Sequence, residues 1–493
     1  MRGRAVIGVV SFALSFSLGT ARSEKQVDFR QLEAVVREEL KESKTPGAAV
    51  AIVSGDRVVY EKSFGVANVE TAAPVTPDML FRAGSICKML TAAVLVGLAD
   101  EGKIALDAPL EKSVAGLAPR LSRLTADQLL SHTAGLIDPA RICCAQEEGA
   151  LTMEVRAYRD EDYFFTEPGR IFSYSNTGYH IVGYLIEQLS NERYADAMRH
   201  RLFEPLGMKH TTFRPTFAMT FPLSQGHDAE GRGAPTVVRP FVNNVGDWPS
   251  GYACTSVAEL SRFAIALMNR GKIDGTQVLS PTLLERLSKP WVEVPFDWEI
   301  PKGFLEGAQY GHGFFLQEHR GVRILHHGGT IVGFGAFIVL VPEKRFAVVV
   351  MANRTGTILG KTVEAAMELF LSLQPKPPPL AAEPIAMTKD EMEEIVGTYR
   401  NGLLRIDLFI RGGQLVRKET YPTTVEEGPG REIETTVRKI GRDRFVFTPP
   451  GQVPRAGYAG ATQFTVIRDA AGKPEYLHGS LEAAAKVTPS PER

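Results

Sequence analysis

Ser85 and Lys88 lie three residues apart in the stretch FRAGSICKML, and this spacing could support nucleophilic catalysis. On a helix, side chains at i and i+3 have Cβ atoms about 5–6 Å apart, so both can face one cleft. A serine at the start of a helix also lies beside the positive end of the helix dipole, which favours developing negative charge. Two fixed residues nevertheless recur by chance about once in a chain of this length, so the pair alone does not exclude a capping serine and a solvated lysine.

Two further short polar patterns occur later in the chain, each beside a regular element. Tyr174-Ser175-Asn176 precedes the stretch TGYHIVGYLIEQLS, whose apolar spacing predicts an amphipathic helix. His327-Gly328-Gly329 stands at the start of a predicted strand. Three such patterns in suitable contexts are much more specific than any one of them.

Over roughly residues 28 to 373 the chain resembles the serine hydrolases related to class C β-lactamases, DD-peptidases and family VIII esterases. In this comparison SICK is the Ser-x-x-Lys element, YSN is Tyr-x-Asn, and HGG is the third, Lys/His-x-Gly element. The connecting stretches LTADQLLSHTAGL, FEPLGMKHTTF and GFGAFIVLVPEKRFAVVVMAN are similar to this family as well.

The resemblance implies a role for each matched residue. Ser85 would be the nucleophile that forms an acyl-enzyme, and Lys88 and Tyr174 would share the acid–base work. Backbone N–H groups of Ser85 and Thr330 would hold the oxyanion. Asn176 would hydrogen-bond either the substrate or Lys88. His327 and Gly329 would contact the substrate.

The pairing of a lysine with a tyrosine has a physical reason. A lysine with a pKa of about 10.4 or a tyrosine with one of about 10 is protonated at pH 7, and deprotonating either costs about 4–5 kcal/mol. When the two lie together, the lysine cation favours tyrosinate, and burial lowers the lysine pKa. Such a pair titrates as a unit, so neither Lys88 nor Tyr174 is named here as the sole base.

The third element departs from the β-lactamase pattern, which usually has Lys-Thr-Gly. His327 is mostly neutral at pH 7 unless its pKa is raised, and Gly328 has no hydroxyl. We therefore expect weak anchoring of a substrate carboxylate. This favours esterase, D-aminopeptidase, amidase or DD-peptidase-like activity over β-lactam hydrolysis, with weak β-lactamase activity left open.

Other chemistries are less well supported by the sequence. The ten histidines include no HExxH pair, and no Gly-x-Ser-x-Gly occurs, so neither a metal site, a cofactor nor a nucleophile elbow is expected. His132 is more simply a structural histidine, and Cys87 points about 200° around the helix from Ser85. The alternative left open is a non-catalytic peptidoglycan- or protein-binding scaffold of the same fold.

Apolar and turn patterns divide the chain into four parts. Predicted strand pairs from both ends of residues 24–373, with helices between them, indicate an α+β hydrolase domain: an antiparallel sheet flanked by helices, plus a mostly helical subdomain. Residues 374–384 hold five prolines and form a stiff linker. Residues 385–493 alternate in polarity between glycine turns, which predicts a small all-β, barrel-like domain. That domain is similar to the lipocalin-like domain of some relatives.

Residues 1–23 have the layout of a secretory signal peptide. Arg2 and Arg4 precede an apolar run, and Ala21-Arg22-Ser23 has the small-x-small character of a cleavage site. We expect an extracytoplasmic protein, periplasmic or secreted, with no integral membrane span after cleavage; an uncleaved anchor is the alternative.

Partners and cysteine chemistry follow from composition. The net charge is −1 and no basic stripe occurs, which argues against nucleic acid and leaves a small ester, amide or peptide substrate. A homo-oligomer is left open. An oxidising compartment would permit one disulfide between the Cys143/Cys144 pair and Cys254, with Cys144–Cys254 as the pairing considered, although spacing does not establish it.

Overall fold

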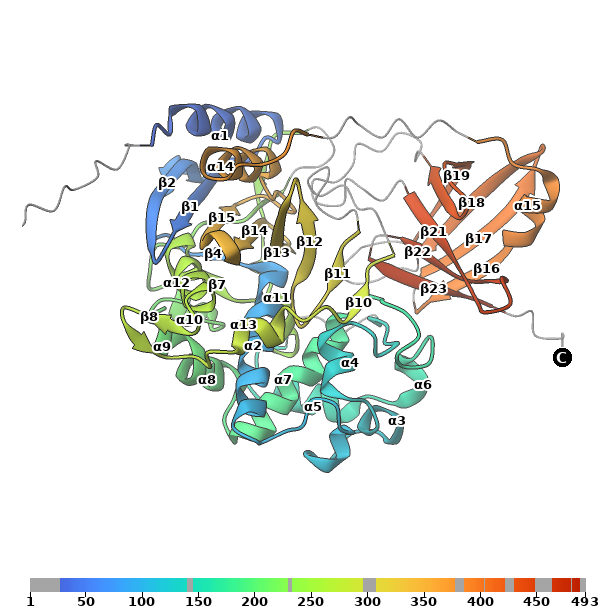
Figure 1. Cartoon of the computed structure of the whole chain (residues 1–493), viewed down its shortest axis with the longest axis horizontal. Helices are drawn as coiled ribbons and strands as arrows, with labels where there is room; N and C mark the ends of the chain where they lie inside the picture. The colour runs from blue at the N-terminus through green and yellow to red at the C-terminus, as the bar shows by residue number, and fades with distance from the viewer. Residues whose placement is uncertain are drawn as a thin grey trace, which may run out of the picture.

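The computed structural model describes residues 27–139, 145–228, 233–295, 307–376, 385–402, 404–421, 430–447, 463–479 and 481–487. The predicted signal peptide, Cys143, Cys144 and most of the proline-rich linker lie outside these residues. The described part forms an α+β domain followed by a separate all-β barrel (Figure 1), which confirms the predicted fold class.

A nine-stranded sheet forms the centre of the first domain. Its strands are ordered β10 (Val292–Glu293), β11 (Gln309–Tyr310), β12 (Phe315–His319), β13 (Val322–Ile331), β14 (Phe334–Val341), β15 (Phe346–Ala352), β1 (Gly47–Ser54), β2 (Arg57–Asn68) and β3 (Ala73–Pro74). All neighbouring strands run antiparallel, and the pairing of Val50 with Val350 joins the two ends of the domain. The sheet is therefore closed by its N- and C-terminal segments, as the sequence predicts.

Helices cover both faces of this sheet. α1 (Arg30–Glu42) and α14 (Gly360–Phe370) lie side by side on one face (Figure 1). The apolar face of α1, including Val36, packs with Met367 of α14 against Val50 and Val348 of the sheet. Because the central strands are covered on both sides, β1, β14 and β15 are apolar at nearly every position, as in other sheets buried on two faces.

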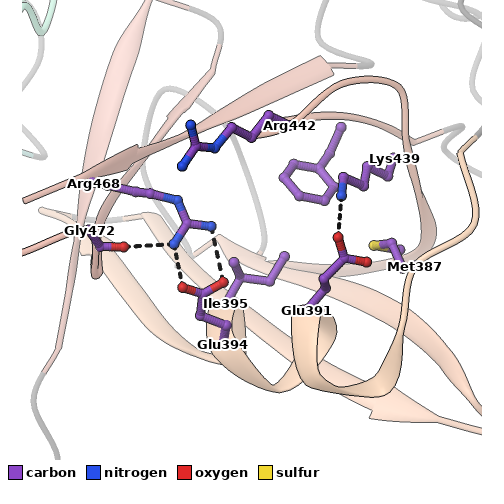
Figure 2. Close-up of a pocket in the computed structure, with 9 residues that line it drawn as sticks. Met387, Glu391, Glu394, Ile395, Lys439, Arg442, Arg468 and Gly472 are labelled. Carbon is purple, nitrogen blue, oxygen red and sulfur yellow. Dashed lines mark hydrogen bonds and ion pairs between the residues drawn. The ribbon is translucent and has the colours of Figure 1, made fainter.

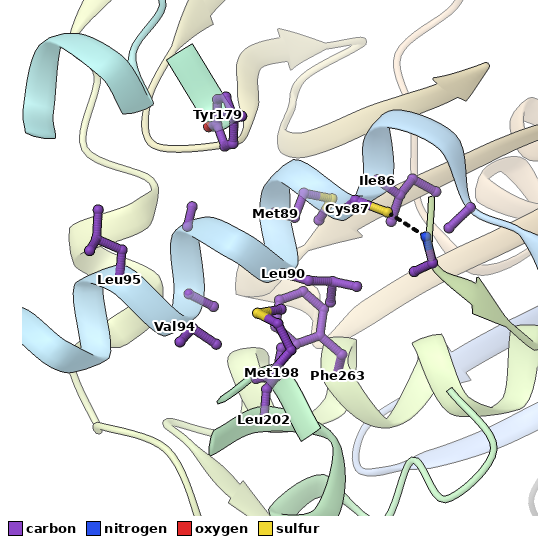
Figure 3. Packing of buried hydrophobic residues seen from close by; sticks show 14 of the residues in the cluster. Ile86, Cys87, Met89, Leu90, Val94, Leu95, Tyr179, Met198, Leu202 and Phe263 are labelled. Atoms are coloured by element: carbon purple, nitrogen blue, oxygen red, sulfur yellow. Dashed lines mark hydrogen bonds between the residues drawn. The ribbon is translucent and has the colours of Figure 1, made fainter. Parts of the chain in front are cut away.

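α2 (Cys87–Asp100) lies at the centre of the opposite layer. The sequence predicts a helix with a single apolar stripe, formed by Ile86, Met89, Leu90, Ala93, Val94 and Leu98. Instead, α2 is buried on almost all sides, including the side of Lys88. In Figure 3, Leu90 of α2 packs with Met198, Leu202 and Phe263 from the helices around it. A helix enclosed on every side must be apolar all round, and this leaves little amphipathic contrast.

The remaining helices of this domain follow α2 in the chain, and several of them pack against it. They are α3 (Pro119–Ser122), α4 (Ala126–Leu130), α5 (Ala150–Ala157), α6 (Asp160–Tyr163), α7 (Asn176–Ser190), α8 (Tyr194–Met198), α9 (Glu204–Leu206), α10 (Pro215–Ala218), α11 (Trp248–Gly251), α12 (Val257–Met268) and α13 (Leu283–Leu287). Short strand pairs join β4 (Phe81–Arg82) to β7 (Cys254–Thr255), β5 (His227–Asp228) to β6 (Thr236–Val237), and β8 (Lys272–Ile273) to β9 (Thr276–Gln277). Among the described residues, no helix has both the length and the apolar character that a membrane span requires.

The second domain is a closed barrel of eight antiparallel strands. They are β16 (Gly397–Asn401), β17 (Leu404–Arg411), β18 (Gln414–Tyr421), β19 (Arg431–Lys439), β20 (Arg444–Phe447), β21 (Gln463–Arg468), β22 (Pro474–Gly479) and β23 (Glu482–Lys486). β23 pairs with β16, so the barrel leaves no open sheet edge.

α15 (Lys389–Ile395) packs Met392 and Ile395 against the apolar interior of this barrel. A pocket of about 220 Å³ lies beside this helix (Figure 2). In it, Arg468 donates to Glu394 at 2.5 and 3.2 Å, and Lys439 donates to Glu391 at 2.6 Å. These four charged groups satisfy one another, and none of the motif residues lines this pocket.

Candidate active site

Ser85 lies in a short 3₁₀ turn, Gly84–Ile86, that leads directly into α2. Such a turn tightens the start of a helix and directs its side chains differently from the following turns. From Phe81 to Val96, Ser85 is the one residue that is not fully buried. The turn therefore presents the Ser85 hydroxyl at the surface of an otherwise enclosed helix.

Lys88 is fully buried beside it, and its Nζ contacts three oxygens. Nζ lies 3.3 Å from Ser85 Oγ, 2.7 Å from Asn176 Oδ1 and 2.9 Å from the carbonyl oxygen of Ser250. Burial lowers the pKa of Lys88 from 10.5 to about 7, although nearby Asp138 and Asp247 oppose that shift. A large fraction of Lys88 is therefore neutral at pH 7.

The three oxygens can accept from the three N–H groups of a charged lysine, and they also suit a neutral Lys88 that accepts a proton from serine. A neutral amine has two N–H donors and one lone pair, whereas the ammonium ion has three donors and no acceptor. Asn176 Oδ1 and the Ser250 carbonyl can only accept, so they occupy the two N–H groups of neutral Lys88. The lone pair is then left for the Ser85 hydroxyl.

Tyr174 lies just before α7, at the other side of Lys88. Ser175 is the N-cap of α7, and its Oγ accepts the Gly178 N–H at 3.2 Å. The Lys88 Nζ lies 4.6 Å from the centre of the Tyr174 ring. The Tyr174 ring also stacks on the His132 ring, with the two centroids 4.2 Å apart. The structure thus brings Ser85, Lys88 and Tyr174 to one place.

Asp138 is a site residue that the sequence did not indicate. Its carboxylate accepts from Ser175 Oγ at 3.0 Å, the Asn176 backbone N–H at 2.9 Å, Asn176 Nδ2 at 2.8 Å and the Thr177 N–H at 2.8 Å. An anion is favourable at the N-terminus of a helix. By accepting from Asn176 Nδ2, Asp138 also turns Asn176 Oδ1 toward Lys88. Asp138 lies 37 to 39 residues before these partners, so no local spacing marks it.

We expect Asp138→Asn to lower kcat by about tenfold, because Asn176 would then be held less firmly against Lys88. The low-pH limb of kcat/KM should also move to lower pH, because the Asp138 charge raises the Lys88 pKa. Asp160→Asn is the matched control, since Asp160 accepts two backbone N–H bonds at Arg120 and Leu121, away from the motifs. Equal loss of kcat in both variants would contradict this role.

Strand β13 completes the site at the other side of Ser85. A Cβ on Gly329 would lie 2.0 Å from the Ala83 carbonyl oxygen, and one on Gly84 would lie 2.6 Å from the Thr330 nitrogen. Gly84 also has φ +53°, which L side chains rarely adopt. These two glycines let β13 approach the 3₁₀ turn closely and bring the Thr330 backbone nitrogen close to Gly84, the residue before Ser85. The expected pair of oxyanion donors, the backbone N–H groups of Ser85 and Thr330, therefore belongs to two neighbouring segments.

His327 is buried on β13 and neutral. Burial lowers its pKa from 6.5 to about 3, with the Lys88 charge acting in the same direction. Its Nδ1 lies 2.6 Å from the Gly328 carbonyl, which can only accept, so Nδ1 carries the hydrogen. Nε2 then accepts from Tyr310 OH at 3.2 Å. Both ring nitrogens are thus engaged by the protein.

The other candidate groups have structural surroundings. His132 is buried, and its Nδ1 accepts the Ser175 N–H at 3.0 Å, as expected for a hydrogen-bonded structural histidine. Cys87 accepts the Ala253 N–H at 3.2 Å (Figure 3), and burial raises the pKa of its thiol to about 12. His326 is buried beside Phe315.

Cys254 is buried and forms no disulfide with another described residue. Cys144 lies outside the described residues, so the Cys144–Cys254 pairing stays a prediction. In the part of the chain that the structure describes, no group of three or more His, Cys, Asp or Glu side chains is arranged to hold a metal ion.

Several known proteins are similar to this chain in sequence or in fold. Protein flp from Staphylococcus aureus (strain MW2) is 26% identical over 351 residues, which are 68% of this chain and 65% of that protein, so this chain matches less than two thirds of it. Penicillin-binding protein 4 from Amycolatopsis lactamdurans is 28% identical over 368 residues, 73% of this chain and 94% of that protein. The octameric penicillin-binding protein homologue from Pyrococcus abyssi has a similar fold, with a TM-score of 0.63 and 22% identity over 93% of this chain and 100% of that one.

The family profile described as Beta-lactamase matches residues 32–368. This range covers most of the chain and contains Ser85, Lys88, Tyr174, Asn176 and His327. It ends before the β-barrel, which is a separate domain. The three sequence motifs and the sheet that carries the third of them therefore fall within one family match, and the chain belongs to the Beta-lactamase family.

Proposed function

We propose that the protein is a serine hydrolase that cleaves ester, amide or peptide bonds through an acyl-enzyme on Ser85. The observation that carries this proposal is the buried Lys88, whose Nζ lies 3.3 Å from Ser85 Oγ and whose pKa is lowered to about 7. A base with a pKa near the working pH combines the correct protonation state with a useful driving force for proton transfer. Family membership supports the same reaction class.

In the first half of the reaction, Ser85 Oγ attacks the substrate carbonyl carbon and its proton passes to Lys88 Nζ. The backbone N–H groups of Ser85 and Thr330 would stabilise the oxyanion that forms. Collapse of this intermediate breaks the bond to the leaving group, which takes a proton from the Lys88–Tyr174 pair. In the second half, water attacks the acyl-enzyme, again with Lys88 and Tyr174 moving the proton, and Ser85 is released.

The test is labelling with a fluorophosphonate followed by intact-mass and peptide analysis. One adduct per chain on Ser85 is expected, because only an activated serine is phosphonylated quickly. A folded protein that neither reacts nor turns over esters, D-amino-acid amides or nitrocefin would instead favour a non-catalytic peptidoglycan- or protein-binding scaffold.

We propose a substrate that does not depend on a carboxylate anchor at the third motif. His327 is neutral, and its two nitrogens bond to Gly328 and Tyr310, so it supplies no cation to a substrate. This favours neutral esters, amides and peptides over β-lactams, whose carboxylate needs a partner. The likeness to Penicillin-binding protein 4 of Amycolatopsis lactamdurans nevertheless keeps β-lactams among the compounds to be tested.

His327→Lys is expected to raise the rate of reaction with nitrocefin relative to a neutral p-nitrophenyl ester by about tenfold. A charge-assisted hydrogen bond to a carboxylate contributes roughly 1.5–3 kcal/mol, and about 1.4 kcal/mol corresponds to a factor of ten. His327→Gln, which adds no charge, is the matched control. If both variants change the ratio equally, charge at this position does not select the substrate.

The proposal includes action outside the cytoplasm, which rests on the charged, apolar and small-residue layout of residues 1–23. We also propose that the protein can form a homo-oligomer. The octameric homologue from Pyrococcus abyssi supports this proposal.

A further inference from the structure

Hairpin β22–β23 of the barrel contacts the segment that carries Tyr174, although the two are more than 300 residues apart in the chain. Each of three consecutive residues of that segment makes one hydrogen bond to the hairpin. His478 Nε2 donates to the Phe172 carbonyl at 3.1 Å, the Ala483 N–H donates to Ser173 Oγ at 3.2 Å, and the Tyr174 N–H donates to the carbonyl of Leu481 at 2.9 Å. In Figure 1 these strands lie on the side of the barrel that faces the first domain.

The contact continues toward the N-terminal side of the segment. Thr166 and Tyr476 hydroxyls lie 2.5 Å apart, and Arg170 Nη2 lies 2.7 and 3.0 Å from the two carboxylate oxygens of Glu475. Ile171 packs with Tyr476 in a small apolar cluster. The exposed Arg170–Glu475 pair contributes little by itself. Together, these contacts join Thr166 and the continuous stretch 170–174 to one hairpin.

Leu481 has an unusual backbone conformation for its residue type. Its φ is +74°, a region that glycine enters readily and that a side chain with a Cβ makes unfavourable. The Leu481 side chain is 8% exposed and packs with Phe172, Tyr310 and Phe315, and Tyr174 borders the same cluster. The apolar contacts of the side chain therefore hold a conformation that the residue would otherwise avoid.

We propose that hairpin β22–β23 is a positioning element of the active site, and that Leu481 anchors it there. The hairpin holds the backbone of Phe172–Tyr174 from one side, while the cap of α7, His132 and Asp138 hold the following residues from the other. The Tyr174 ring is thereby kept over Lys88. The barrel is then a working part of the hydrolase and not an appended module. This inference rests on the proposed role of Tyr174.

Leu481→Gly removes the apolar anchor of the hairpin, and comparison with a buried leucine elsewhere in the barrel separates positioning from folding. Glycine accepts φ +74° and keeps the carbonyl that receives the Tyr174 N–H, but it removes the apolar anchor. We expect kcat for a p-nitrophenyl ester to fall by about 10–100-fold with little change in KM, because a misplacement near 1 Å can cost about 100-fold. The rate of fluorophosphonate labelling should fall in parallel. The melting temperature should fall, as it should in the control below, because loss of the buried Leu481 side chain outweighs the relief of backbone strain. Both rates are therefore compared well below the melting temperature.

Leu415→Ala is the matched control, since Leu415 is fully buried in the barrel interior and belongs to a different apolar cluster. It should lower the melting temperature of the barrel while leaving kcat and the labelling rate unchanged. Wild-type kcat in Leu481→Gly, or an equal loss of kcat in Leu415→Ala, would overturn the positioning role. Ser85→Ala measured in parallel separates the two hypotheses: if it is inactive while Leu481→Gly is unimpaired, the hydrolase assignment stands and the hairpin inference fails.

Discussion

Ser85→Ala is expected to lower kcat for p-nitrophenyl ester hydrolysis by on the order of 10⁴–10⁶-fold, the range found when a nucleophile is removed from a serine hydrolase. The acyl-enzyme cannot form without Oγ, and the remaining rate would come from substrate binding and the oxyanion donors. The Ser85 hydroxyl accepts one long hydrogen bond from Lys88, at 3.3 Å, so loss of the hydroxyl should change the free energy of unfolding little.

The matched control is Ser122→Ala, which removes a hydroxyl from α3 that donates to Glu111 and to the Pro119 carbonyl. This variant should retain wild-type kcat. Ester turnover in purified Ser85→Ala at more than one per cent of the wild-type rate would show that Ser85 is not the nucleophile.

Lys88→Arg is expected to lower kcat by about 10²–10⁴-fold, the usual contribution of general acid–base catalysis. The guanidinium keeps the positive charge but is not deprotonated in proteins, so it has no lone pair for the Ser85 proton. Circular dichroism and the melting temperature check that the variant is folded. Wild-type activity in Lys88→Arg would exclude a lysine base.

The same residue predicts the pH dependence of the wild-type enzyme. Only neutral Lys88 can accept a proton, and its pKa is about 7, so kcat/KM should rise as the pH increases through about 7. The charged groups that act on Lys88 are Asp138 and Asp247, which raise its pKa, while the depressed pKa values of His132 and His327 keep both rings neutral. A profile with no ionisation between pH 6 and 8 would contradict this assignment.

The polar motifs and the main strands were predictable because their signals are local. Ser85 and Lys88 are three residues apart, so helix geometry alone places them together. The apolar stretches that form β1, β14 and β15 predict buried strands, even though the sequence does not show which strands they pair with. The α+β class and the all-β C-terminal domain were confirmed for the same reason.

The surroundings of the motifs were less predictable. The sequence suggests one apolar stripe for α2, whereas the helix is enclosed and Lys88 is buried with it. A helix with one apolar stripe and a helix that is apolar all round differ in sequence at only a few positions. Which of the two is buried depends on the other helices that pack around it. The lowered pKa of Lys88 follows from that burial.

From the sequence alone we predicted the fold class, which the structure confirms, and the reaction class that we propose, through three short motifs and their order. Only the tertiary structure decided how the site is supported. Asp138 bonds to residues 37 to 39 positions away, and the carbonyl of Leu481 receives the N–H of Tyr174 across two domains. Periodicity and propensity report on neighbours within a few turns of chain. Contacts of this kind depend on how loops close and domains pack, which no local pattern encodes.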